Sequence, residues 1–132
     1  MSSLSKMQNI RTRSVSPENF TGEKGAGGQA VEGTGASCAR DLGRGWKVSP
    51  SVQIEPGKTF TLADISGQGM VKHIWVTTSS MRNRTLVLRI YWDKQEFPSV
   101  EAPLGDFFAS ADEQQYEQLT SLAVCVNPRR GL

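Results

Sequence analysis

The stretch that most constrains the fold of this chain is residues 85–93, where apolar side chains recur at every second position. That spacing is the period of a β-strand with one face buried. The alternating set is Leu86, Leu88, Ile90 and Trp92, and the opposite face carries Val87, Arg89, Tyr91 and Asp93. The pattern predicts a strand with one face in a hydrophobic core. A cation, an aromatic ring and a carboxylate share the other face, which is an arrangement suited to a site.

Similar patterns recur at intervals of about 10 residues and are separated by Gly- and Pro-rich turns. They predict strands at residues 51–54, 59–65, 70–78 and 119–126, and a short extended piece at residues 98–101. The sequence at residues 55–58 (EPGK) is a strong turn signal, and residues 94–96 are the predicted turn after residues 85–93. One short helix is predicted near residues 36–42, with Gly43 as its left-handed stop. Regularly spaced short strands favour an all-β sandwich or barrel over alternating strands and helices.

The predicted domain organisation is simple. Residues 1–15 are polar and are predicted to form a flexible N-terminal arm. Residues 16–132 are predicted to form one domain, which begins with a glycine-rich loop. No closing element follows the strand predicted at residues 119–126, so a sheet edge would stay open. We therefore expect this domain to be incomplete, and to be part of something larger or of an assembly.

Composition excludes several partners. The 15 Lys and Arg against 13 Asp and Glu give a net charge of +2, which is too balanced to indicate nucleic acid. The sequence contains no apolar stretch of signal-peptide or membrane-spanning length, so we expect no membrane association and a cytoplasmic location. Cys38 and Cys125 are far apart in the sequence and are expected to be free thiols.

The sequence also contains few motifs that would indicate a cofactor or a metal ion. The glycine-rich loop is not followed by the Gly-Lys-Ser/Thr of a phosphate loop, and one His with two distant Cys cannot supply a zinc site. Asp93, Glu101 and Asp106 could hold a hard cation, although solvated or paired carboxylates are the more usual reading. A Ser-His-Asp triad would have to use His73, but the sequence contains no Gly-x-Ser-x-Gly turn of a serine hydrolase. No metal and no cofactor are predicted.

Carbohydrate is the ligand class that the remaining candidate residues fit. The three tryptophans could be platforms for sugar rings or could pack in the core. Glu101 and Asp106 are a weak match to the paired carboxylates of glycoside hydrolysis. Arg89 could pin the following turn through a carboxylate or could line a polar pocket with Asp106. The predicted substrate-binding residues are Trp46, His73, Trp75, Arg89, Trp92, Asp93, Glu101 and Asp106.

Longer strings carry a family resemblance. They are SPENF at 16–20, EGTGA at 32–36, ARDLGRGWKVSP at 39–50, HIW at 73–75, RIYWD at 89–93 and PSVEAPLGDFF at 98–108. In this order and spacing, over about residues 13–131, the chain resembles the N-terminal part of the DUF2961 family, also classed as glycoside hydrolase family 172.

The resemblance implies a double jelly-roll (β-sandwich) fold, trimer-based homo-oligomers, and retaining hydrolysis of furanosides such as α-fructofuranosides or arabinofuranosides. It also implies a catalytic pair of Glu residues downstream of the region represented here. The chain is then expected to be roughly the first jelly roll of such an enzyme, truncated and inactive alone. Catalytic residues stay unassigned, and neither Glu32 nor Glu101 is proposed to replace the pair. The alternative is a non-catalytic jelly-roll module for assembly or carbohydrate binding.

Overall fold

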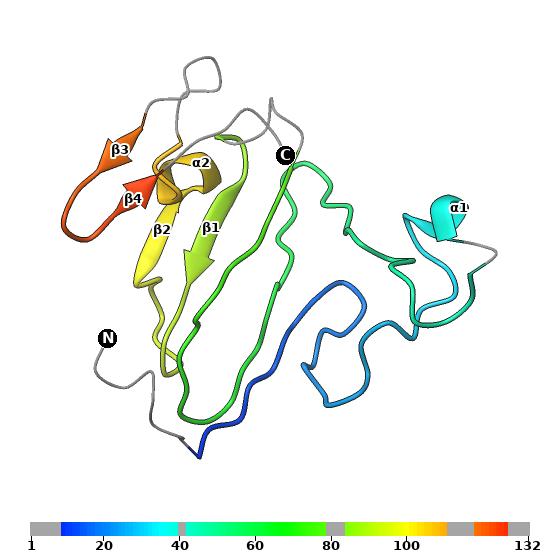
Figure 1. Ribbon diagram of the computed structural model, residues 1–132. Coiled ribbons are helices and arrows are strands. Elements are labelled where there is room, and N and C mark those ends of the chain that lie inside the picture. Colours follow the sequence, from blue (N-terminus) through cyan, green and yellow to red (C-terminus); the bar gives the residue numbers. More distant parts are fainter. Residues whose placement is uncertain (1–8, 40–41, 79–83, 111–117, 127–132) are drawn as a thin grey trace. The chain divides into compact units, whose positions relative to one another are not determined.

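The computed structural model describes residues 9–39, 42–78, 84–110 and 118–126 (Figure 1). The chain divides into two compact units, Met1–Met70 and Val71–Leu132. In the described ranges, the regular elements of the chain are α1 (Ala36–Ala39), β1 (Val87–Ile90), β2 (Val100–Pro103), α2 (Leu104–Phe107), β3 (Leu119–Thr120) and β4 (Cys125–Val126). Strands outnumber helices in this part of the chain, in agreement with the predicted all-β class. No helix in these ranges could cross a bilayer.

The second unit is built around a hairpin of β1 and β2, which pair antiparallel. Leu88 lies opposite Ala102 and Ile90 lies opposite Val100, and all four side chains are half-buried. Because side chains alternate across a strand, these residues share one face and Arg89 lies on the other. The predicted alternation over the centre of residues 85–93 is therefore confirmed. Trp92, predicted for the buried face, lies beyond β1 and is about half exposed.

The hairpin reverses direction at Trp92–Gln95, a turn that begins two residues before the one predicted at residues 94–96. The backbone N–H of Gln95 donates to the carbonyl of Trp92 at 3.0 Å, and Asp93 and Lys94 have φ values of 49° and 62°. Positive φ at both central residues defines a type I′ turn, whose twist matches that of the flanking strands. The Gln95 side-chain amide donates to Ser99 Oγ at 2.6 Å and so fastens the returning segment.

Helix α2, which was not predicted, follows β2 directly. Leu104 donates its backbone N–H to the carbonyl of Leu86 at 2.8 Å, and this contact fixes the start of α2 beside β1. At its other end, Ser110 donates to Gly105 and Ala109 donates to Asp106, with Ala109 at φ 53°. This is a Schellman cap, in which a residue in the left-handed region satisfies the last carbonyls of a helix.

The last predicted strand, at residues 119–126, is wrong as a single element. It is a small antiparallel hairpin in which Leu119 pairs with Val126 and Thr120 with Cys125. The hydroxyl of Ser121 accepts the backbone N–H groups of Ala123 and Val124, which bends the chain between β3 and β4. Serine favours such turns because its short side chain competes for backbone hydrogen bonds.

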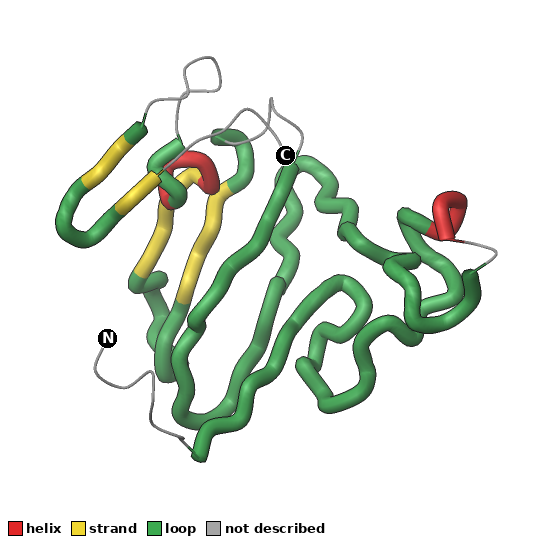
Figure 2. The backbone as a smooth tube through the Cα atoms, viewed as in Figure 1, coloured by secondary structure: helices red, strands yellow, loops and turns green. Residues whose placement is uncertain are grey.

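The strands predicted at residues 51–54, 59–65 and 70–78 are also wrong, because the structure has no strand there (Figure 2). Alternating side chains favour extended backbone, but a strand also requires a partner with which to form ladder hydrogen bonds. The turn predicted at residues 55–58 is confirmed. Lys58 donates to the carbonyl of Glu55 at 3.0 Å, and Gly57 has a φ of 73°, as expected at the third position of a type II turn.

The first unit is organised by side chain to backbone contacts. The carboxylate oxygen Oε1 of Glu18 accepts the backbone N–H groups of Val48 at 2.7 Å and Ser49 at 2.6 Å. Gly35 donates to the carbonyl of Val48 at 2.8 Å. Val48 is only 2% exposed and is the one buried hydrophobic side chain among the described residues. Residues 16–20, 32–36 and 46–50, each from a string that carries the family resemblance, therefore meet at this point.

Helix α1 begins at Ala36, as predicted for the helix near residues 36–42, and is described to Ala39. Residues 40 and 41 of the predicted helix lie outside the described ranges. Gly43, the predicted left-handed stop, has a φ of 69°. The predicted arm at residues 1–15 is described only from residue 9 onward, and its flexibility remains a prediction.

Leu88→Ala is expected to lower the free energy of unfolding by about 1–3 kcal/mol. A fully buried leucine loses roughly 2–5 kcal/mol on truncation, and Leu88 is half-buried. Urea unfolding measures the change. The matched control is Val87→Ala on the exposed face of the same strand, for which we expect a loss below about 1 kcal/mol. Equal losses for the two variants would show that β1 has no buried face.

Candidate functional site

The polar face of the β1–β2 hairpin carries an ion pair between directly opposed residues. Arg89 pairs in register with Glu101, and Arg89 Nε donates to Glu101 Oε2 at 2.5 Å. The hydrogen bond that Arg89 donates to Glu101, together with the negative charge of Glu101, raises the pKa of Arg89 above its ordinary value. A raised pKa stabilises the folded state while the guanidinium is charged, and this contribution disappears only in strongly alkaline solution. Arg89 is therefore charged at neutral pH.

A second ion pair joins the start of the hairpin to α2. Arg84 Nη2 donates to Asp106 Oδ2 at 3.1 Å, with side-chain exposures of 63% for Arg84 and 29% for Asp106. The other carboxylate oxygen, Asp106 Oδ1, is buried and has no hydrogen-bond partner in the described part of the chain. Asp106 precedes Phe107 and Phe108, whose rings meet edge to face with centroids 5.0 Å apart.

The two ion pairs contain three of the polar residues that were predicted for one site. Arg89 pairs with the carboxylate of Glu101, whereas Asp106 pairs with Arg84. Asp93 is exposed and occupies the type I′ turn. His73 is exposed and precedes Trp75 in a segment without regular structure. The structure thus gives Arg89 and Asp106 different ion-pair partners, and binding of substrate by any of them remains a prediction.

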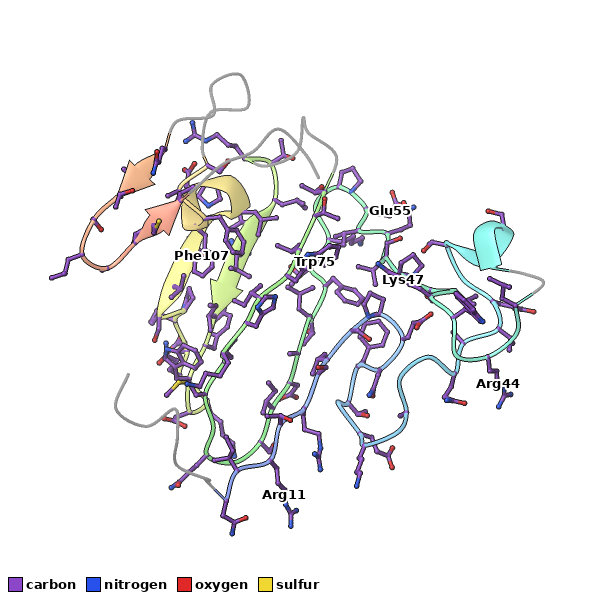
Figure 3. All side chains as sticks on the ribbon, in the orientation of Figure 1. Arg11, Arg44, Lys47, Glu55, Trp75 and Phe107 are labelled. Carbon is purple, nitrogen blue, oxygen red and sulfur yellow. The ribbon has the colours of Figure 1, made fainter. Side chains whose placement is uncertain are left out.

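None of the three tryptophans is buried. Trp46 in the first unit is 52% exposed, and Trp75 and Trp92 in the second unit are 69% and 48% exposed. Figure 3 labels Trp75 and Phe107, two of the aromatic side chains of the second unit. The core-packing alternative therefore fails for these rings in the structure of this chain. Exposure of the ring is a requirement for stacking on a sugar.

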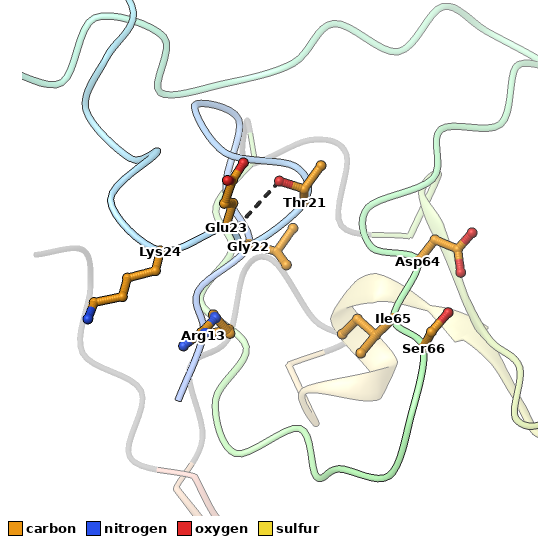
Figure 4. Close-up of a pocket in the computed structure, with 9 residues that line it drawn as sticks. Arg13, Thr21, Gly22, Glu23, Lys24, Asp64, Ile65 and Ser66 are labelled. Carbon is orange, nitrogen blue, oxygen red and sulfur yellow. Dashed lines mark hydrogen bonds between the residues drawn. The ribbon is translucent and has the colours of Figure 1, made fainter. Parts of the chain in front are cut away.

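A groove in the first unit was not anticipated from sequence. It encloses about 480 Å³. Figure 4 shows the residues that line the groove. Residues 21–24 form one wall, and residues 64–66 form the segment that faces it. The lining combines two cations, two carboxylates, two hydroxyls and two aliphatic side chains around a glycine, namely Arg13, Val15, Thr21, Gly22, Glu23, Lys24, Asp64, Ile65 and Ser66. Donors and acceptors are both present, as polar, uncharged ligands require.

One wall of this groove is shaped by Asn19. Its side-chain amide donates to the carbonyl of Glu23 at 3.0 Å, and its Oδ1 accepts the backbone N–H of Glu23 at 3.2 Å. Gly22 follows with a φ of 65°, a left-handed conformation for which glycine carries no steric penalty. The loop that lines the groove is therefore held by its own side chains, without regular secondary structure.

Sequence reasoning missed Arg84 and the groove residues. Arg84 lies 22 positions before its partner Asp106, and no local sequence pattern predicts an ion pair over that separation. A usable signal for the groove was the Asn-x-Thr-Gly string at residues 19–22, because Asn and Gly together favour a side-chain-stabilised turn. Among the residues that the structure describes, no group of three or more His, Cys, Asp or Glu side chains could hold a metal ion.

Comparison with known protein families identifies the family of this chain. The family model described as GH172 domain-like matches residues 46–128, which is more than half of the chain. The match includes both ion pairs, all three exposed tryptophans and all elements from β1 to β4. No curated protein matches the chain.

Proposed function

The chain belongs to the GH172 domain-like family of glycoside hydrolases, and from this premise we propose that it contributes part of a carbohydrate site to an enzyme that acts on furanosides. The substrates are of the α-fructofuranoside or arabinofuranoside type. The observation that carries the proposal is the family match over residues 46–128. Three exposed tryptophan rings and two arginine–carboxylate pairs supply groups that suit the apolar faces and the hydroxyls of sugars.

We further propose that these residues form a jelly roll that is completed by assembly into trimer-based oligomers. Many large apolar side chains of the described residues are exposed, among them Met70, Trp75, Phe97 and Leu122. Large apolar side chains that are exposed in an isolated chain are often covered by a protein partner. The hairpin of β1 and β2 also leaves strand edges on which further strands could pair.

The 132-residue polypeptide alone is expected to show no furanosidase turnover. A retaining mechanism needs two carboxyl groups about 5–5.5 Å apart, one as nucleophile and one as acid and base. In the described part of the chain, Glu101 is paired with Arg89 and Asp106 with Arg84, and neither carboxylate is assigned to either role. The check is release of p-nitrophenol from p-nitrophenyl α-L-arabinofuranoside. Turnover that disappears in Glu101→Gln would contradict this expectation and make Glu101 catalytic.

A second function, from a different class, is a non-catalytic module for assembly, and the exposed apolar surface is the observation that favours it. The two functions differ in what the chain binds. An assembly module forms oligomers, seen by light scattering, and does not bind sugars. A carbohydrate site binds furanosides whether or not the chain associates.

A further inference from the structure

The ion pair on the exposed face of the β1–β2 hairpin uses only part of its hydrogen-bonding capacity. Arg89 Nε donates to Glu101 Oε2 at 2.5 Å, and among the described residues this is the one hydrogen bond of either side chain. Arginine and a carboxylate frequently pair through two parallel hydrogen bonds instead. The Nη groups of Arg89 and the Oε1 atom of Glu101 therefore remain available, as donors beside an acceptor.

An aromatic ring lies beside this pair, and all three side chains are open to solvent. The exposed fraction of the side chain is 43% for Arg89 and 52% for Glu101, and Tyr91 is 49% exposed. Side chains two residues apart in an extended chain share one face, so Tyr91 lies on the side of Arg89. After the larger effects of Glu101, Tyr91 also helps to raise the pKa of Arg89, as a phenol close to the guanidinium does.

These three side chains match the two kinds of surface that a sugar presents. Each sugar hydroxyl both donates and accepts, so two neighbouring hydroxyls require a donor and an acceptor side by side. The C–H face of the sugar ring is apolar and packs on an aromatic ring, as the apolar body of tyrosine allows. The charges of Arg89 and Glu101 balance each other, so the pair favours a neutral ligand over an ion.

We propose that Tyr91, Arg89 and Glu101 form an exposed platform that binds a sugar ring, with Tyr91 as a binding residue that is absent from the predicted substrate-binding set. The ligand class rests on the proposed function. Tyr91 stacks on the C–H face of the sugar. The Nη groups of Arg89 donate to one hydroxyl oxygen, and the neighbouring hydroxyl donates to Glu101 Oε1. The ion pair between Nε and Oε2 holds both partners in place.

The test is an NMR titration of the whole 132-residue chain with methyl α-L-arabinofuranoside. Nuclear Overhauser effects are expected between the sugar and the ring protons of Tyr91. Tyr91→Ala is expected to raise the Kd about fivefold, because the stacking surface is lost, whereas Tyr91→Phe keeps the ring and should change the Kd less than about twofold. The matched control is Phe97→Ala, which removes a ring that is 74% exposed in the same hairpin, with an expected change below about twofold.

Glu101→Gln tests the polar half of the platform. It is expected to raise the Kd about fivefold or more, because hydrogen bonds to a charged acceptor are stronger than those to an amide. Glu96→Gln makes the same change at an exposed position between β1 and β2 and should change the Kd less than about twofold. If Tyr91→Ala does not give the amide NMR spectrum of a folded chain, the Overhauser effects and Glu101→Gln decide.

The outcomes separate this platform from the proposed function. Binding of the furanoside with equal affinity by Tyr91→Ala and the unmodified chain would overturn the platform alone. Equal weakening by Tyr91→Ala and Phe97→Ala would also overturn it, because any exposed ring would then serve. Contacts of Tyr91 with methyl α-D-glucopyranoside, and none with the furanoside, would support the platform and contradict the proposed function. A chain that binds neither sugar would contradict both.

Discussion

Glu18→Ala is expected to lower the free energy of unfolding of the first unit by about 2–4 kcal/mol. A hydrogen bond to a charged group contributes roughly 1.5–3 kcal/mol, and the half-buried Glu18 accepts two, from the backbone N–H groups of Val48 and Ser49. Without the carboxylate, the N–H of Val48 would remain buried and unpaired. Hydrogen exchange at the Val48 and Ser49 amides measures the loss directly.

Two further variants test whether the loss of stability comes from the carboxylate of Glu18. Glu32→Ala removes an exposed carboxylate from the same unit and is expected to change the stability by less than about 0.5 kcal/mol. Glu18→Gln keeps an acceptor oxygen without its charge and should lose roughly half as much as Glu18→Ala. If the Val48 and Ser49 amides exchange equally fast in the unmodified chain and in Glu18→Ala, Glu18 does not organise this unit.

Gly33→Ala is expected to destabilise the first unit by about 2–3 kcal/mol through a steric clash. A Cβ atom at Gly33 would lie 2.5 Å from Ser49 Cβ and 2.7 Å from Ser49 Cα, so the backbone itself would have to move. Overpacking of this kind typically costs about 1–3 kcal/mol. Gly33 also has a φ of 156°, which L side chains rarely adopt. Chemical unfolding of the two proteins compares their stabilities.

Gly27→Ala is the control from the same glycine-rich segment. Its Cβ would meet no atom within 4 Å, and Gly27 is not among the glycines with positive φ. We expect this variant to be neutral or slightly stabilising, because alanine reduces the entropy of the unfolded chain. Equal destabilisation by the two substitutions would mean that flexibility of the loop, and not the contact with Ser49, requires glycine.

The parts of the fold that could be predicted from sequence are those fixed by nearby residues. The alternation of Leu86, Leu88 and Ile90 predicted the buried face of β1, and the Pro56-Gly57 pair predicted a turn, which the structure shows to be of type II. Local backbone preferences were sufficient in both cases. The segments at residues 59–65 and 70–78 show the limit of such patterns. Their alternation is real, but pairing depends on a partner strand that a local pattern does not reveal.

The contacts that position the candidate sites join residues far apart in sequence. Glu18 reaches across 30 residues to Val48, and Arg84 across 22 residues to Asp106. The sequence predicted a carboxylate partner for Arg89, and the register of β1 and β2, which places Glu101 directly opposite Arg89, determines which carboxylate it is. Helix α2 was missed because it is a single turn that contains Gly105, and glycine weakens any helical pattern.

The measurement that tests the central claim most directly compares binding of furanosides and pyranosides by the unmodified chain. Methyl α-L-arabinofuranoside and methyl α-D-fructofuranoside are titrated beside methyl α-D-glucopyranoside, with the fluorescence of the exposed tryptophans as the readout. The account predicts saturable binding of at least one furanoside, with an affinity about tenfold or more above that of the pyranoside. Absence of saturable binding, or equal binding of all three sugars, would contradict it.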